Sequence, residues 1–204
     1  DLDTVENVFV QNPAAGTWTV EVIASEVNAD SHVETPQVDA DYALVVSGVQ
    51  PQACGPGTTY CSPKSNACGP GALAFSGASS ASSSSGFLVT GANPTGGRIG
   101  VLLYNQGPGP TPPYVPFGGF GDGVLCMRIQ GLKHARGAAS GGIAGQCGGG
   151  AQFAVDMNAY AAGALGGFPA PFLSTPGETV HCQWWGRESP SSAYLTDGGE
   201  YVVC

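Results

Sequence analysis

The stretch DYALVVSGVQPQACGPGTTYC, residues 41–61, divides the sequence into two parts of different chemistry. It reads as the last strand of one β-rich module, a short Pro/Gly linker, and the first cysteine-bearing segment of a second module. No cysteine precedes it, and all seven cysteines of the chain lie at or beyond Cys54. The sequence therefore predicts two modules, 1–49 and 60–204, joined by a linker at 50–59.

Charged residues, like the cysteines, are unevenly distributed along the chain. Residues 1–41 hold nine acidic residues and no Lys or Arg, whereas the remainder holds six acids and six bases. Nucleic-acid binding needs clustered bases that displace counterions, and the one small basic group, Arg128, Lys133, His134 and Arg136, is read as a solvated loop. No apolar window approaches the roughly 18 residues of a membrane helix. We expect neither a nucleic-acid partner nor a membrane span.

Composition predicts an all-β fold. Charged residues make up 10% of the chain, against about 25% in an average soluble domain. Short apolar runs separated by Gly, Pro and Ser are typical of many short strands. In the second module these runs fall at 71–76, 86–91, 99–104, 124–130, 151–157, 179–186 and 199–204, which suits a disulfide-containing antiparallel β-sandwich. The segment 76–86 (SGASSASSSSG) is expected to be a flexible, solvent-facing connection.

The first module contains three predicted strands, 4–10, 17–24 and 42–47. Three strands with one apolar face do not close a sandwich by themselves. We therefore expect an incomplete β-sandwich piece, which either continues upstream in a parent protein or docks on a neighbour.

Alternation within TVHCQWWGR (179–187) predicts a half-buried strand. One face carries Val180, Cys182 and Trp184, and the other carries His181, Gln183 and Trp185. The wholly apolar face is predicted to be core. The strand 199–204 is expected to pair with 179–186 through the 189–198 loop, which would bring Cys204 within reach of Cys182.

The cysteines predict structural disulfides and an extracellular location. Seven cysteines in a Gly-, Ser- and Pro-rich chain with few lysines are typical of an oxidising compartment. None forms a CxxC, and the spacing of Cys54, Cys61 and Cys68 is not typical of zinc ligands. The odd count leaves one thiol free or paired outside the chain, and spacing alone does not determine connectivity.

Two regions resemble known secreted proteins. The segments VENVFVQNPAAGTWTVEVIASEV (5–27) and DYALVVSG (41–48) resemble the end of the β-sandwich that follows the catalytic domain of secreted bacterial subtilisin-like serine peptidases. The complete sandwich of that family has further strands upstream. The resemblance implies that this chain is the C-terminal region of such a peptidase.

The second module resembles the uncharacterised β-rich C-terminal modules of large secreted proteins from planctomycetes and myxobacteria-like organisms. The resemblance rests on a recurring order of segments: Tyr60-Cys61-Ser62-Pro63, GFLVTG (86–91), IGVLLY (99–104) and TVHCQWWGR (179–187). It implies a fold and a location but no chemistry, and it makes Cys61–Cys126 a candidate disulfide.

No catalytic site is predicted. A subtilisin-like triad requires Asp, His and Ser to converge from separate motifs, which three consecutive residues, Asp30-Ser31-His32, do not achieve. Ala138-Ala139-Ser140-Gly141-Gly142, with His134 six residues before Ser140, half-matches a nucleophile elbow but lacks its first glycine. The parent protein is the expected peptidase, a subtilisin-like serine endopeptidase.

Two candidate binding sites remain. Asp30, Glu34, Asp39 and Asp41 lie in an acidic loop whose oxygens are candidate calcium ligands, although a solvated loop is the favoured alternative. No other cofactor is expected. Trp185, Tyr114, Phe117 and Phe120 are candidates for an exposed aromatic platform, against the alternative that they pack beneath loops.

The sequence therefore predicts a non-catalytic accessory region that stabilises, targets or anchors a secreted parent. Its expected partners are the upstream part of that parent or neighbouring copies joined through an open sheet edge. A self-assembling structural protein is the main rival, and a carbohydrate- or surface-binding module is the third hypothesis.

Overall fold

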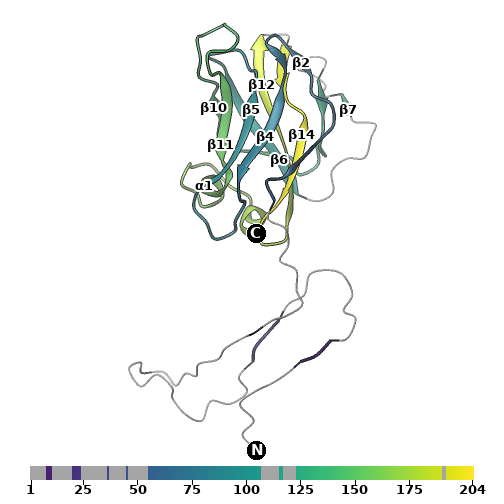
Figure 1. The fold of residues 1–204 in the computed structure, drawn as a ribbon, viewed down its shortest axis with the longest axis vertical. Coiled ribbons are helices and arrows are strands. Elements are labelled where there is room, and N and C mark those ends of the chain that lie inside the picture. Colours follow the sequence, from purple (N-terminus) through teal and green to yellow (C-terminus); the bar gives the residue numbers. More distant parts are fainter. Residues whose placement is uncertain are drawn as a thin grey trace, which may run out of the picture. The chain divides into compact units, whose positions relative to one another are not determined.

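The computed structural model describes residues 8–10, 20–23, 36, 45, 55–106, 115–116, 123–189 and 192–204 (Figure 1). The chain divides into two compact units, Asp1–Val49 and Gln50–Cys204. Every strand described below belongs to the second unit. The predicted N-terminal strands, and with them the incomplete sandwich piece, lie outside the described residues except for a few isolated positions.

The second unit is all-β, antiparallel and disulfide-containing, as the sequence predicts. Its larger sheet has the order β1 (Thr58–Tyr60), β14 (Gly198–Val202), β12 (Thr179–Ser189), β6 (Ile99–Gln106) and β10 (Ala138–Ala139), with β13 (Ser192–Leu195) paired to β12 and β9 (Lys133–His134) paired to β6. Its smaller sheet has the order β11 (Gln152–Asp156), β5 (Phe87–Ala92) and β4 (Ala72–Gly77). Two short ribbons join β2 (Ser65–Asn66) to β3 (Gly69–Pro70), and β7 (Val115–Pro116) to β8 (Val124–Leu125).

Six of the predicted strands are found with ends shifted by a few residues: β4, β5, β6, β11, β12 and β14. The strand predicted at 124–130 is wrong beyond Leu125, because Cys126 turns its N–H toward the Gln183 side chain on β12. The predicted 189–198 loop contains β13, and β1 begins at Thr58, inside the predicted linker.

Two short helical turns are not predicted by the sequence pattern: α1 (Met157–Ala161) and the 3₁₀ turn Pro171–Ser174. The apolar run 151–157 is predicted to be one strand. The strand ends at Asp156 and a helix begins at Met157, because the Asp156 carboxylate accepts a hydrogen bond from the Ala159 N–H at 3.1 Å. This bond satisfies a backbone N–H of the first helical turn that has no partner within the helix.

The two sheets share one hydrophobic core. Val180, Cys182 and Trp184 are fully buried in it, which confirms the predicted core face of β12. Across from them, Phe153 of β11 stacks on Trp184 with ring centroids 5.3 Å apart. Phe87 of β5 meets Tyr201 of β14 edge to face at 4.7 Å. Offset and edge-to-face contacts of this kind add to the stabilisation from burial.

Glycines on each sheet make room for large side chains of the other. A Cβ at Gly91 of β5 would lie 2.8 Å from the Trp184 ring. On the larger sheet, a Cβ at Gly100 would lie 2.8 Å from the Phe153 ring, and one at Gly199 would clash with Leu73 and Phe75. Close packing leaves no slack for these atoms, so glycine is needed at these positions for the two sheets to approach.

The serine-rich connection between β4 and β5 is anchored rather than flexible. The Asn158 side-chain amide donates to the carbonyls of Ala78 (3.1 Å) and Ser85 (3.2 Å), and its oxygen accepts from the Ser80 N–H (3.0 Å). Ser79 is buried. The predicted solvent-facing connection is therefore confirmed at residues 76–78 and 82–86, which are exposed, and is wrong at Ser79; α1 supplies hydrogen-bond partners to its backbone.

Two disulfides, Cys61–Cys126 and Cys68–Cys147, link segments that lie outside the strands. The first is the pair that the resemblance implied. The predicted Cys182–Cys204 pair is wrong, because Cys182 is a buried free thiol and Cys204 forms a disulfide elsewhere. The strands do pair as expected, but Cys182 lies opposite Gly199. Five residues of strand, about 16 Å, separate that position from Cys204.

Replacement of Gly91 by Ala is expected to lower the free energy of unfolding by about 1–3 kcal/mol, because the added methyl overpacks the core against Trp184. Gly137→Ala is the matched control, since its Cβ would meet Ile99 at an ordinary 3.4 Å. Urea unfolding followed by tryptophan fluorescence measures both. Equal midpoints for the two variants would contradict the packing argument.

Replacement of both Cys61 and Cys126 by Ala is expected to cost about 4 kcal/mol of unfolding free energy, because the bridge closes a long loop in the unfolded chain. The pair Cys68→Ala/Cys147→Ala is the comparison, since the sequence separations are 65 and 79 residues and the loop entropies are nearly equal. Denaturant unfolding in the absence of reductant measures the loss. An unchanged midpoint for either pair would refute the cross-linking role of that bridge.

Candidate functional site

The face of β12 that points away from the core is buried as well. Gln183 is fully buried, and its amide donates to the carbonyls of Val124 (3.1 Å) and Thr196 (2.8 Å) while its oxygen accepts from the Cys126 N–H (3.0 Å). Leu103, Leu125 and Met127 form a second apolar cluster on this side. The segment around β8 therefore covers the larger sheet.

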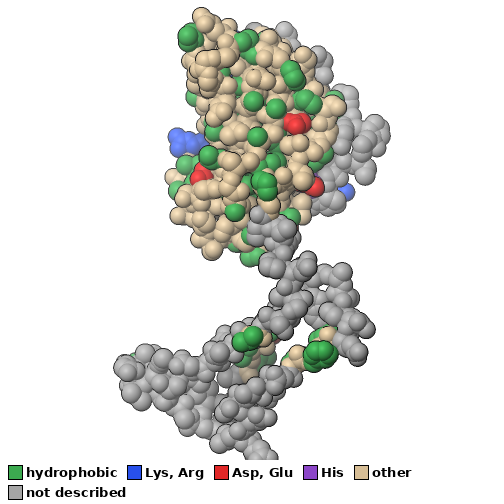
Figure 2. Space-filling view, viewed as in Figure 1, with side chains coloured by type: hydrophobic (Ala, Val, Ile, Leu, Met, Phe, Trp, Pro, Cys, Tyr) green, Lys and Arg blue, Asp and Glu red, His purple; other side chains and the backbone are tan. Residues whose placement is uncertain are grey.

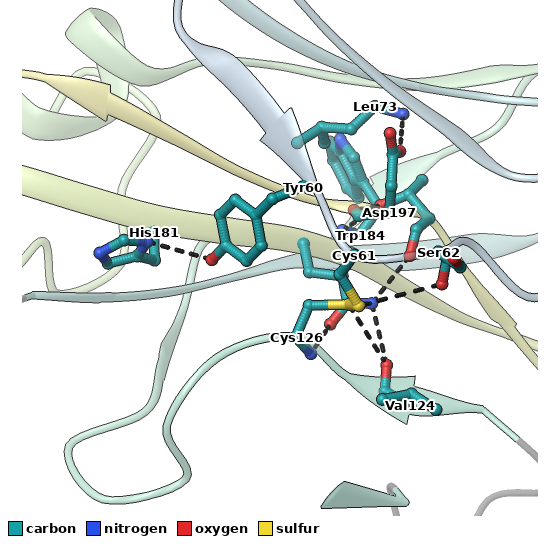
Figure 3. Close-up of a disulfide and its surroundings, with 11 residues drawn as sticks. Tyr60, Cys61, Ser62, Leu73, Val124, Cys126, His181, Trp184 and Asp197 are labelled. Atoms are coloured by element: carbon teal, nitrogen blue, oxygen red, sulfur yellow. Dashed lines mark hydrogen bonds between the residues drawn. A yellow bond between two sulfur atoms is a disulfide. The ribbon is translucent and has the colours of Figure 1, made fainter. Parts of the chain in front are cut away.

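A polar chain of three side chains crosses the strands at the edge of this covered face. The Tyr60 hydroxyl of β1 lies 3.0 Å from Nδ1 of His181 on β12, and Oε2 of Glu200 on β14 lies 3.5 Å from the same nitrogen. Figure 3 shows the Tyr60 ring between His181 and the Cys61–Cys126 disulfide. This is the strongest candidate for chemistry in the described residues, because it joins an imidazole, a phenol and a carboxylate.

The burial of this chain indicates what it can do. The His181 side chain is 3% exposed, whereas Glu200 is 46% exposed. The imidazole is therefore closed to a substrate, whereas the Glu200 carboxylate is exposed and the Tyr60 side chain is partly exposed. General acid–base catalysis requires the imidazole to lie within hydrogen-bonding reach of the reacting group. The geometry therefore favours a clamp that ties β1 to β12 and β14.

The neighbouring thiol does not add a nucleophile to this chain. Cys182 is fully buried and points into the core, on the face of β12 opposite His181. Burial, and secondarily the charge of Asp197, raises the pKa of the Cys182 thiol far above its ordinary value. The reactive thiolate form is therefore strongly disfavoured.

The Ser140 hydroxyl has a structural role. It is 1% exposed; its hydroxyl donates to the Thr95 carbonyl at 3.0 Å and accepts from the Arg98 N–H at 3.0 Å. His134, its suggested partner, is exposed on β9, with Nδ1 3.2 Å from the Ala135 carbonyl oxygen. The half-matched nucleophile motif is thus a hydrogen-bonded turn.

Trp185, one of the four residues of the predicted aromatic platform, is not fully exposed. This side chain is half-buried and packs against the cluster of Leu103, Leu125 and Met127, which agrees with the alternative that the aromatics lie beneath loops. Tyr114, Phe117 and Phe120 lie outside the described residues. Figure 2 shows a face on which hydrophobic side chains are scattered singly rather than gathered in a strip.

The predicted calcium ligands Asp30, Glu34, Asp39 and Asp41 also lie outside the described residues. Within the part of the chain that the structure describes, no group of three or more His, Cys, Asp or Glu side chains is arranged to hold a metal ion. The same residues contain no helix long and apolar enough to cross a membrane.

Asp197, which the sequence pattern does not single out, joins the two sheets. Asp197, before β14, accepts a hydrogen bond through Oδ1 from the Leu73 N–H of β4. Burial raises the pKa of the Asp197 carboxyl, and hydrogen bonds from the Leu73 backbone, its own backbone and the Thr59 side chain oppose the rise. The signal was Asp197-Gly198-Gly199, a turn former beside two glycines.

No protein-family model, no curated protein and no solved structure matches this chain.

The raised pKa of Asp197 predicts how the stability of the protein depends on pH. Its pKa is higher in the folded than in the unfolded state, so between the two values the folded state binds more protons and stability falls as pH rises. Asp197→Asn keeps an oxygen acceptor for the Leu73 N–H but does not titrate. The stability of the variant relative to the natural protein should therefore increase from pH 3 to pH 7.

The measurement is urea unfolding of both proteins at a series of pH values. Asp156→Asn is a control for carboxylate removal, since Asp156 is likewise hydrogen-bonded to backbone N–H groups. A stability difference that stays constant or shrinks toward neutral pH would contradict the predicted direction for Asp197.

Proposed function

We propose that the Gln50–Cys204 unit is a non-catalytic accessory module of a secreted protein, which it stabilises, targets or anchors. The observation that carries the proposal is the use of its reactive side chains. His181, Ser140 and Gln183 are buried in bonds that join one segment of the unit to another. Groups committed in this way stabilise a scaffold and are not presented to a substrate.

The disulfides support the extracellular part of the proposal. Two bridges join segments 65 and 79 residues apart in the sequence. Bridges of this kind persist in oxidising compartments and are rare in the cytosol. A secreted parent accounts for them.

The proposed parent is a subtilisin-like serine peptidase. This part of the proposal is supported by the resemblance of residues 4–48 to the end of the β-sandwich that follows the catalytic domain in that family. A module that follows such a domain acts on the stability or the location of the enzyme. It has no need of a hydrolytic site of its own.

The two rival hypotheses have less support. Self-assembly through an open sheet edge depends on residues 1–48, few of which are described. Carbohydrate binding depends on the aromatic platform, and Trp185 is partly covered by the cluster of Leu103, Leu125 and Met127.

The test is deletion of residues 50–204 from the gene in its host. We expect the half-life or the cell-associated fraction of the secreted parent to fall, while its activity per mole on a short peptide substrate stays unchanged. The control replaces the unit with an unrelated disulfide-bonded β domain of similar length. That replacement should not restore a targeting or anchoring role.

Two outcomes would overturn parts of the proposal separately. Loss of activity per mole from a folded parent would show that the unit takes part in catalysis. A secreted parent without peptidase activity towards any such substrate, and without the Asp, His and Ser motifs upstream, would refute the subtilisin-like assignment and leave the accessory role to be judged by half-life and location.

A further inference from the structure

One surface of this acidic protein is basic. The chain carries a net charge of −9, yet residues 123–177 contain three bases and a single acid, Asp156. These three Lys and Arg residues lie with His134 within nine residues, 128–136, which we call the basic strip; its basic side chains are Arg128, Lys133, His134 and Arg136. All four side chains are exposed. The strip follows the outer edge of β6, since Lys133 and His134 pair with Tyr104 and Leu103.

The charges of the basic strip are not neutralised within the described residues. No described carboxylate forms an ion pair with Arg128, Lys133 or Arg136. Asp156, the one acid of residues 123–177, accepts hydrogen bonds from the N–H groups of Gly86 (2.7 Å) and Ala159 (3.1 Å), and Glu178, the next acid along the chain, accepts one from Nε2 of Gln106 at 2.7 Å. Unpaired cations concentrated on one surface attract an anionic partner.

An exposed aromatic side chain lies beside the strip. Phe168 is 96% exposed, and the loop that carries it is held against the strip at two points. Nη1 of Arg136 donates to the Leu165 carbonyl at 3.0 Å. Gly167 lies against the Tyr160 ring, and the Tyr160 hydroxyl donates to the His134 carbonyl at 3.3 Å.

The strip itself contains a second exposed apolar residue, Ile129, which is 61% exposed. Exposed single hydrophobic residues are ordinary on protein surfaces. Here, however, two large ones accompany unpaired cations on a chain whose net charge is strongly negative. The combination of apolar side chains with surrounding Lys and Arg is typical of proteins that lie on a membrane surface.

We propose that the basic strip and Phe168 bind the surface of an anionic phospholipid bilayer. The cations contact lipid phosphates, and Phe168 and Ile129 enter the boundary between headgroups and acyl chains. A hydrated soluble polyanion would attract the cations equally but would leave both apolar side chains in water. Lipid is therefore the partner that uses both features. The inference deepens the anchoring role proposed above, although it rests only on the surface of the Gln50–Cys204 unit.

The test uses the purified 204-residue chain and sedimentation with vesicles. One set contains phosphatidylcholine with about 30 mol% phosphatidylglycerol, and the other contains phosphatidylcholine alone. We expect binding to the anionic vesicles only, and its loss at about 0.5 M salt, where screening is nearly complete over a few ångströms. Each cation near such a surface contributes about 1 kcal/mol, which corresponds to about fivefold in affinity.

Arg128→Gln/Lys133→Gln should therefore weaken binding by more than tenfold, and Phe168→Ser should weaken it at unchanged charge. The matched controls are Arg98→Gln, an exposed cation before the opposite end of β6, and Ile143→Ser, an apolar residue with 62% exposure. Neither control should change binding by more than twofold. Unchanged urea midpoints establish that the variants remain folded.

Absence of binding to anionic vesicles at low salt would overturn the inference. A second result would also overturn it: Phe168→Ser binds anionic vesicles as tightly as the natural protein, and the natural protein binds heparin as tightly as it binds vesicles. A soluble polyanion would then be the partner. Either result leaves the accessory role intact, since the deletion experiment tests that role through half-life and location.

Discussion

The structure depends on the close approach of two sheets whose largest side chains fit over glycines. Trp184 needs Gly91, and Phe153 needs Gly100, because a Cβ at either glycine would occupy space that an aromatic ring fills. The largest fully buried side chains are aromatic, Trp184 first among them, and burial of apolar area is the main favourable term in folding. Abundant glycine, which at first suggests a loosely ordered chain, is thus partly a requirement of dense packing.

The polar side chains of the unit have a consistent role around that core. Asn158 holds the serine-rich connection, Gln183 holds the segment that covers the larger sheet, and Asp197 joins β14 to β4. Each one bonds backbone groups of a segment distant in the sequence, and at Gln183 these groups are buried, where a missing partner would be costly. A domain with so few charged residues therefore orders its connecting segments with amides, disulfides and the half-buried carboxylate of Asp197.

Because these polar side chains are used for internal hydrogen bonds, interaction with a partner falls to the outer surface. The candidate chain of Tyr60, His181 and Glu200 is enclosed at its imidazole, whereas the basic strip and Phe168 are exposed. A scaffold with an enclosed interior and a chemically distinct surface suits a module that locates a larger protein. The proposed function and the proposed membrane contact follow from this difference between interior and surface.

The sequence by itself determined the all-β class, six of the strand positions and the core face of β12, because alternation and Gly/Pro punctuation are local properties. It also pointed to the Cys61–Cys126 pair, through resemblance. Only the tertiary structure decided that Cys182 stays a free thiol, that Ser140 and His181 are enclosed, and that Phe168 lies beside the basic strip. These outcomes depend on which distant segments cover one another, and that follows from three-dimensional packing rather than from any local pattern.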